Sequence, residues 1–171
     1  MDFMDFFTPR QVLDRLADPN AGFNICKFKD KTLPPRVVPH YHVIISLGNN
    51  QAIVICIITS ELENRKNYYE RIAAKTGNAT LLDSLIALDK TKLKCFTLNS
   101  IVDCHQAECL TLDELHSRID YTHPIRFQLE PDGANRFFDE EQKESIVKGI
   151  LNSSIVRDIV KQEIRTLGYA S

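Results

Sequence analysis

The sequence has no apolar stretch that is long enough to cross a lipid bilayer. Its longest apolar run, residues 52–58, contains seven residues, whereas a membrane-spanning helix needs about 20. Residues 1–7 are apolar but carry Asp2 and Asp5 and no basic residue, so they lack the basic start of a secretory signal. We therefore expect a cytoplasmic protein that does not bind a membrane.

The sequence also lacks a pattern of paired cysteines and the known nucleotide-binding motifs, and its net charge is small. The five cysteines are odd in number and form no framework, which fits the reduced thiols of the cytosol. The formal net charge of −2 excludes the basic field of a dedicated nucleic-acid coat protein, although a local basic patch stays open. Without a phosphate-binding glycine loop, a dinucleotide fingerprint or a nucleophile elbow, a nucleotide-dependent enzyme and an α/β-hydrolase are disfavoured.

What is present is the composition of a folded α+β domain. Hydrophobic residues make up 43% and charged residues 26% of the 171 residues, which suits one globular domain. The predicted domain, 1–171, has an N-terminal helix within 1–20, a β core over 21–130 with an inserted helix at 61–75, and a helical hairpin at 139–168.

Alternating and β-branched residues predict short strands through the first two thirds of the chain. Residues 40–47 and 52–58 are separated by Gly48-Asn49-Asn50, so we expect a hairpin at the centre of the core. The predicted strands are 23–28, 40–47, 52–58, 85–88, 93–98, 101–104 and 125–130.

Capping residues and helical periodicity predict the helices. Thr8 followed by Pro9 is a typical helix start, and Thr111 with Glu114 forms the pattern of a capping box. Apolar residues of the tail repeat at helical spacing, which indicates two paired helices. The predicted helices are 9–17, 61–75, 112–119, 139–151 and 154–167.

Two histidines and an arginine are the first candidate site residues. His40 and His42 are two positions apart on a predicted strand, so their side chains share a face. The imidazoles could act as acid and base on an RNA phosphate or bind a metal, and exposed histidines at a strand edge are the structural alternative. Arg36, in the proline-rich loop before them, could clamp a phosphate or be an ordinary surface arginine.

A second group of candidates lies further along the chain. Asp103 and His105 are also two positions apart, and a carboxylate beside an imidazole suits acid–base work near neutral pH, with a solvated polar face as the alternative. Thr59 and Ser60 end a buried strand, where hydroxyls can bind a phosphate, although Ser60 could instead cap the next helix. The spacing of the nearby cysteines and histidines matches no zinc pattern, so we expect no metal.

Three segments, taken in order, resemble the PemK/MazF family of plasmid-maintenance toxins. Residues 40–46 are similar to the family's first-strand motif, Arg-Pro-x-x-Val-x-Ser. Residues 55–60 are similar to the strand that ends in a Thr-Thr or Thr-Ser pair, and residues 98–103 to the later strand with polar and acidic site residues. The helix after Asp139 is similar to the family's terminal helix.

The resemblance implies a small SH3-like β-barrel, usually dimeric, that cleaves RNA without metal or cofactor in a toxin–antitoxin system. The implied partners are RNA, a cognate antitoxin protein and a second copy of the chain. The residues that would be catalytic are His40, His42, Asp103 and His105. Those that would bind substrate are Arg36, Thr59, Ser60 and Ser100.

The chain departs from the family pattern in its arginines. His40 stands at the place of the family's first-strand arginine, and no arginine is adjacent in sequence to Ser100 or Asp103. Two alternatives follow. His40 or His42, with Arg36, replaces the phosphate-neutralising arginines, or the barrel has lost its activity and serves as a protein-interaction module or dimer.

Overall fold

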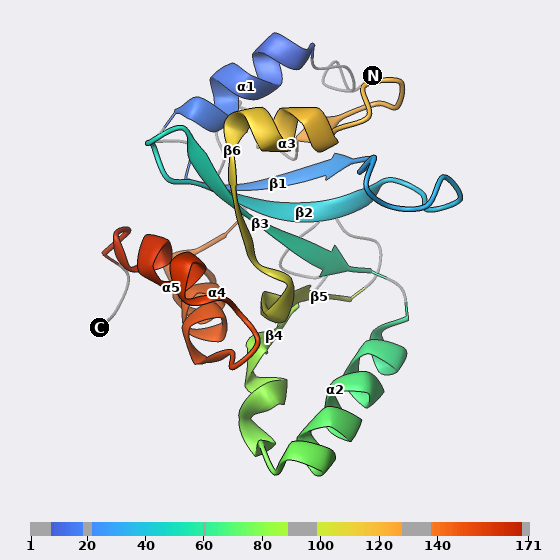
Figure 1. Ribbon diagram of the computed structural model, residues 1–171, viewed down its shortest axis with the longest axis vertical. Helices are drawn as coiled ribbons and strands as arrows, with labels where there is room; N and C mark the ends of the chain where they lie inside the picture. The colour runs from blue at the N-terminus through green and yellow to red at the C-terminus, as the bar shows by residue number, and fades with distance from the viewer. Residues whose placement is uncertain (1–7, 19–21, 60, 89–98, 128–137, 169–171) are drawn as a thin grey trace. The chain divides into compact units, whose positions relative to one another are not determined.

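The computed structural model describes residues 8–18, 22–59, 61–88, 99–127 and 138–168 (Figure 1). The predicted α+β class is confirmed, because antiparallel strands and several helices make up this part of the chain. Contacts divide the chain into two compact units. Unit 1 combines Met1–Val54 with Glu108–Phe138, and unit 2 combines Ile55–Ala107 with Asp139–Ser171. The single domain predicted over 1–171 stays a prediction.

Unit 1 is a small sheet covered on one face by two helices (Figure 1). Its elements are α1 (Pro9–Ala17), β1 (Phe23–Phe28), β2 (His40–Ser46), the first half of β3 (Gln51–Ile58), β6 (Glu108–Thr111), α3 (Leu112–Arg118) and β7 (Arg126–Phe127). Alternate residues of β1 and β2 pack against apolar residues of α1 and α3. This core contains Val12, Leu16, Cys26, Phe28, Ile44, Ala52, Val54, Leu112, Leu115, Ile119, Ile125 and Phe127.

The predicted elements of unit 1 are confirmed to within one or two residues where the structure describes them. The helix over 9–17 begins with a capping box at Thr8, and the second capping box, at Thr111, starts α3 as predicted. The turn between β2 and β3 uses left-handed backbone at Gly48 and Asn50, with φ of 84° and 62°. Of the predicted strand 125–130, residues 126 and 127 pair with β1, Ile125 is buried but not in a strand, and 128–130 lie outside the described residues.

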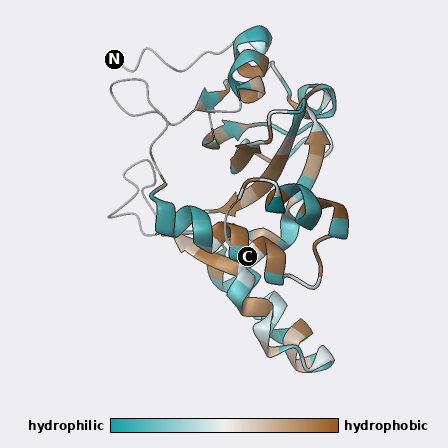
Figure 2. Cartoon of the chain, turned by 90° about the vertical axis from the view of Figure 1, so that its left-hand side faces the viewer, coloured by the Kyte–Doolittle hydropathy of each residue, from teal (hydrophilic) through white to brown (hydrophobic). Residues whose placement is uncertain are grey.

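Unit 2 is dominated by helices. Its elements are the second half of β3, α2 (Leu62–Thr76), the 3-10 helix η2 (Ala79–Ser84), β4 (Leu85–Leu88), β5 (Ser100–Asp103), the 3-10 turn η3 (Cys104–Gln106), α4 (Glu140–Asn152) and α5 (Asp158–Arg165). The buried residues of α4 and α5 are Ile146, Val147, Gly149, Ile150, Val160 and Ile164. Figure 2 shows that hydrophobic residues concentrate in the strands, whereas hydrophilic residues colour much of the helices.

Four predictions in unit 2 have different outcomes. The strand at 85–88 and the helix at 61–75 are confirmed, the latter shifted by one residue. The second tail helix begins at Asp158 and not at 154, because the Ser153 hydroxyl accepts the N–H groups of Ile155 and Val156 in a turn. The predicted strand 93–98 lies outside the described residues.

The strands are hydrogen-bonded in the linear order β4-β5-β3-β2-β1-β7, and β6 also pairs with β3. The order ends at β4 on one side and at β7 on the other, as in an open sheet. Within the part of the chain that the structure describes, no helix is both long enough and apolar enough to cross a lipid bilayer.

Candidate functional site

A three-residue break in strand pairing positions the candidate site of unit 2. Along β3, Val54 pairs with Glu108, whereas Ile57, three residues later, pairs with Val102, six residues earlier. The strand opposite β3 therefore holds three extra residues, which form η3. Such a bulge redirects the side chains beside it.

Asp103 is a fully buried carboxylate at the end of β5. The hydroxyl of Tyr69 donates to it and lies 3.1 Å from both of its oxygens. The Arg65 Nε atom lies 3.6 Å from Oδ2. Burial raises the pKa of Asp103 above its ordinary value, although Tyr69, Arg65 and His105 act in the opposite direction. A buried carboxylate held by these donors fixes the geometry around it.

Helix α2 brings to Asp103 an arginine that the sequence analysis missed. Arg65 lies far from Asp103 in sequence, and its side chain is 35% exposed, so it is anchored on a buried acid yet accessible to solvent. The available signal was its position one helical turn before Tyr69 in the predicted helix 61–75. Among the described residues, Asp103 is the one carboxylate paired with Arg65.

His105 is buried, and both of its ring nitrogens are hydrogen-bonded. Nε2 lies 2.7 Å from the carbonyl oxygen of Leu81, which can only accept, so Nε2 carries a proton. Nδ1 lies 2.6 Å from the hydroxyl of Ser153. The imidazole also packs on Tyr69, with ring centroids 4.3 Å apart. His105 thus cross-links η2, η3 and the C-terminal end of α4.

Asp103 and His105 are neighbours, as predicted, but strand alternation is not the reason. His105 belongs to η3 rather than to a strand, and its backbone N–H bonds to Asp103. The Cys56 thiol also lies within the electrostatic influence of Asp103. Burial, followed by the charge of Asp103, raises the pKa of the Cys56 thiol to about 11, so it stays protonated near neutral pH.

The predicted substrate-binding hydroxyl residues of unit 2 differ in how deeply they are buried. Thr59 follows the end of β3 and is half-buried, whereas Ser100 is buried at the start of β5. Ser60 lies outside the described residues. The residue at the N-cap of α2 is Glu61, in a left-handed conformation with φ of 57° and no side-chain cap.

In unit 1, His42 is buried and stacked on Phe28, with ring centroids 4.1 Å apart. Burial, followed by the neighbouring His40, lowers the pKa of His42 to about 4, so the ring is neutral near pH 7. Among the described residues, no group hydrogen-bonds to its Nδ1 atom. His40 is half-buried, and burial together with Lys29 and Lys27 lowers its pKa below the ordinary value.

Arg36 is exposed on a loop that Lys29 holds in place. The Lys29 ammonium donates to the carbonyl oxygens of Pro34 and Pro35 at 3.1 and 3.3 Å, and to that of Val37. Because one buried cation binds three carbonyls, the loop has a defined shape and presents Arg36 outward.

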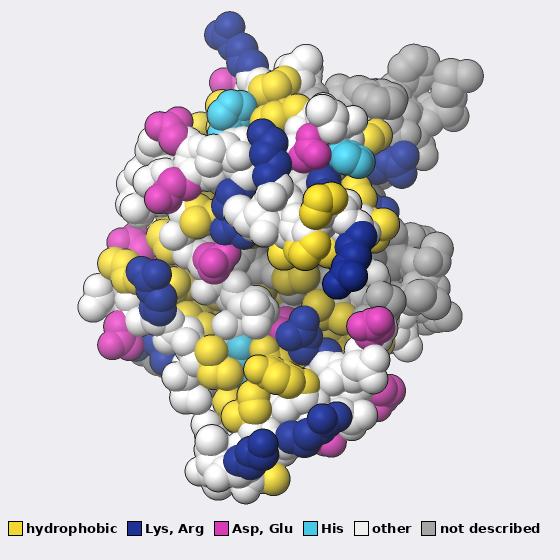
Figure 3. Space-filling model, turned by 45° about the vertical axis from the view of Figure 1, so that its right-hand side comes forward, with side chains coloured by type: hydrophobic (Ala, Val, Ile, Leu, Met, Phe, Trp, Pro, Cys, Tyr) yellow, Lys and Arg dark blue, Asp and Glu magenta, His cyan; other side chains and the backbone are white. Residues whose placement is uncertain are grey.

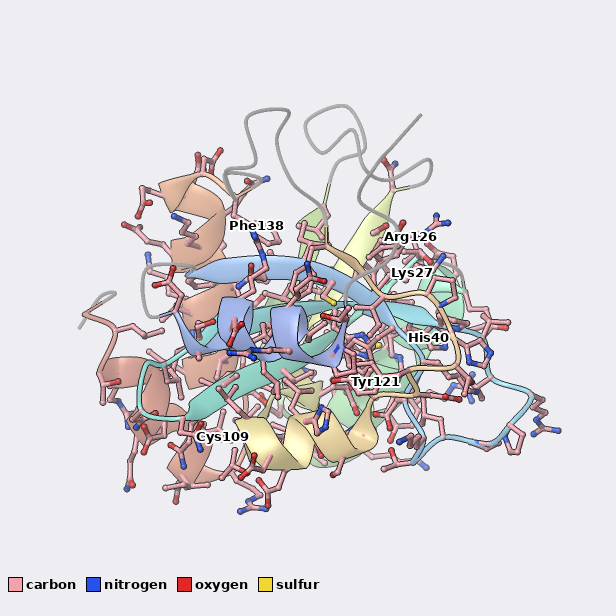
Figure 4. The ribbon with its side chains drawn as sticks, turned by 90° about the horizontal axis from the view of Figure 1, so that it is seen from above. Lys27, His40, Cys109, Tyr121, Arg126 and Phe138 are labelled. Atoms are coloured by element: carbon pink, nitrogen blue, oxygen red, sulfur yellow. The ribbon has the colours of Figure 1, made fainter. Side chains whose placement is uncertain are left out.

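A row of polar side chains crosses the sheet of unit 1. Lys27 pairs with Tyr41 on β2 and with Arg126 on β7, and its ammonium lies 5.0 Å from the centre of the Tyr41 ring. Figure 4 shows Lys27, Arg126 and His40 at the same end of this sheet. Arg126 is exposed and Lys27 is half-buried.

The predicted site residues therefore form two sets. Asp103, His105, Thr59 and Ser100 lie in unit 2, where Arg65 and Tyr69 join them, and His40, His42 and Arg36 lie in unit 1. Within the described ranges, no three His, Cys, Asp or Glu side chains come together in a way that could hold a metal ion. No protein-family model matches the chain, and a search of the curated proteins gives no significant match.

Proposed function

We propose that the chain is a toxin-like, metal-independent endoribonuclease of a toxin–antitoxin-type system, built on a small SH3-like barrel of the PemK/MazF type. The observation that carries the proposal is the pairing of Arg65 with buried Asp103 at 3.6 Å. The sequence of β5 has no arginine of its own, and helix α2 supplies one. A guanidinium at this place can neutralise the phosphate whose charge grows during RNA cleavage.

Arg65 would bind the phosphate, and Asp103 and Tyr69 would position it. The carboxylate faces Nε, and among the described residues no acceptor is hydrogen-bonded to the two Nη groups, which are the ones that suit a phosphate. Thr59, at the end of β3, would add a hydroxyl donor. Asp103 cannot itself reach substrate easily, because it is fully buried, so we assign it a positioning role.

The proposal narrows the residues that would transfer protons. His105 has both nitrogens hydrogen-bonded, and His42 is buried against Phe28, so both are assigned to the structure of their units. His40, in unit 1, is half-buried, and its lowered pKa keeps the imidazole neutral near pH 7, as a proton acceptor requires. Attack by the 2′-hydroxyl of RNA on its own phosphodiester requires no metal or cofactor.

The test is induced expression in bacteria, with growth followed and total RNA mapped for new 5′ ends, together with cleavage by purified protein in the presence of a metal chelator. We expect growth arrest and defined cuts, and we expect Arg65→Gln to reduce cleavage by roughly 10²- to 10³-fold. The matched control is Lys66→Gln, which removes the same charge from the next position. Intact RNA with the parent chain, or equal cleavage by the Arg65 and Lys66 variants, would reject the proposal.

The second candidate is a catalytically inactive barrel that acts as an interaction module or dimer. The burial of His42 and His105 favours it, and so do Ile155 and Ile159 near the start of α5, which are 47% and 44% exposed. In that case, purified protein would leave RNA intact and elute as an oligomer or with a partner. Ile159→Ser would then shift it toward the monomer.

A further inference from the structure

Helix α2 separates its charges by face. At about 100° per residue, Arg65, Tyr68, Arg71 and Lys75 fall within one arc of roughly 120°, which we call the α2 stripe. The acids Glu63 and Glu70 fall on the opposite side. In Figure 3, Lys and Arg side chains gather with hydrophobic ones over the lower part of the molecule, where Figure 1 places α2. The stripe is therefore a cationic surface with an aromatic side chain within it.

Tyr68 is the exposed aromatic residue of the stripe, with 52% of its surface accessible. Its ring packs edge-on against Tyr69, with centroids 5.1 Å apart and planes at 74°. Tyr69 in turn donates its hydroxyl to buried Asp103. An exposed ring that is braced in this way presents a fixed flat face, on which a base can stack with little loss of side-chain entropy.

Two cations of the stripe, Arg71 and Lys75, have no acidic partner among the described residues. Arg71 and Lys75 are exposed, and neither is paired with a described carboxylate, whereas Lys66, off the stripe, lies 3.7 Å from Glu63. From Arg65 to Lys75 the helix rises about 15 Å, so the stripe extends over several phosphates of an extended strand. A helix with this arrangement on a chain of net charge −2 is a local basic patch in a molecule without a basic field.

We infer that the α2 stripe binds the backbone of single-stranded RNA, with one base stacked on Tyr68 and the strand led toward Arg65. Single-stranded RNA fits better than a duplex, because only an unpaired base exposes its flat face to an aromatic ring. It fits better than an acidic peptide, because carboxylates would use the cations but not the ring. The inference rests on the proposed function for the identity of RNA as substrate.

The experiment measures binding separately from cleavage. A labelled single-stranded oligoribonucleotide of mixed sequence, about 12 nucleotides long, carries 2′-O-methyl groups so that it cannot be cut, and its anisotropy is followed at several salt concentrations. We expect Arg71→Gln and Lys75→Gln each to reduce the slope of log Kd against log salt by about 0.7. Lys66→Gln, the control on the other face of the helix, should leave the slope unchanged.

The aromatic part of the inference has its own variants. Tyr68→Ala should weaken binding of the same oligonucleotide roughly 5- to 150-fold, the effect of losing one stacked base, whereas Tyr68→Phe should bind as the parent does. Equal slopes for the Lys75 and Lys66 variants, or a preference for an acidic peptide over the oligonucleotide, would overturn the inference.

These experiments distinguish a failure of the α2 stripe from a failure of the proposed nuclease function. If binding depends on the stripe but unmodified RNA is not cleaved, the stripe is an RNA-binding surface and the nuclease proposal is rejected. If the Tyr68, Arg71 and Lys75 variants cleave unmodified RNA at the parental rate, the inference about the stripe is rejected and the nuclease proposal stands.

Discussion

His42 and His105 are both buried, but different interactions keep them so. His105 satisfies its two ring nitrogens with Ser153 and Leu81, whereas the Nδ1 atom of His42 has no described partner and its ring is covered by Phe28. Adding a proton to His42 therefore places a charge in a buried site, where the backbone hydrogen bond with His40 and the charge of Asp30 offset only part of the desolvation cost. We therefore expect protonation of His42 to lower the stability of the fold rather than to take part in catalysis.

The pH dependence of His42 can be isolated with His42→Phe. Because the pKa of His42 is lowered from 6.5 to about 4, the unfolded chain takes up this proton first, so stability present above pH 6.5 is lost as pH falls toward 4. The loss amounts to roughly 3 kcal/mol for this group. Urea unfolding at a series of pH values should show a flatter profile for the variant, which keeps the ring stacked on Phe28. Parallel profiles for parent and variant would contradict this role.

Sequence reasoning at the residue scale found the acid but not its partner. Asp103 was recognisable as a polar residue in an otherwise apolar strand, and its proximity to His105 was predicted. The pairing with Arg65 and Tyr69 depends on how α2 returns to β5, which no local pattern specifies. For the same reason the burial of His42 was not foreseen, since alternation indicates a shared face but not what covers it.

At the scale of elements, helix α4 packs closely against η3 and β4 at Gly149. A Cβ atom at Gly149 would lie 2.8 Å from the Cys104 Sγ atom and 3.3 Å from Ile86 Cδ1, so the helix approaches η3 and β4 where only glycine fits. Helix boundaries such as Thr8, Thr111 and Asp139 were predictable because each carries its own capping side chain. The 3-10 segments and β6 were not, because pairing and packing elsewhere in the fold stabilise them.

Gly149→Ala should destabilise the protein by about 1–2 kcal/mol, because the steric conflict outweighs the usual helix preference for alanine. Combined with Cys104→Ala, which removes the Sγ atom, the cost should be less than the sum of the single changes. Chemical unfolding of the parent, both single variants and the double variant measures this coupling. Lys148→Ala, at an exposed neighbouring position, is the control, and strict additivity would show that the two residues do not meet.

The whole molecule consists of two units, and each is assembled from two separate stretches of chain. The chain passes from one unit to the other after Val54, after Ala107 and after Phe138. The single domain over 1–171 stays a prediction, and the division into two compact units could not be read from length and composition, because it depends on contacts between residues distant in sequence. Each unit has its own buried apolar residues, so each is expected to open as a unit of its own.

Hydrogen exchange of core variants tests that expectation. Ile146→Ala, in α4, should cost about 2–5 kcal/mol and increase exchange mainly in α2, β4 and α4. Ile44→Ala, in β2, should increase exchange mainly in β1, β2 and α3. Mass spectrometry of peptic fragments reports both. A uniform rise throughout the chain for either variant would mean that the chain unfolds as one cooperative unit.

The three extra residues opposite β3 have a genetic consequence. An in-frame deletion of the codons for residues 104–106 would remove η3 and allow the two stretches on either side of it to pair with β3 in one register. The same deletion would take away His105 and expose the carboxylate of Asp103. A single mutational event could therefore change the surroundings of the Arg65–Asp103 pair while the strands that carry it persist.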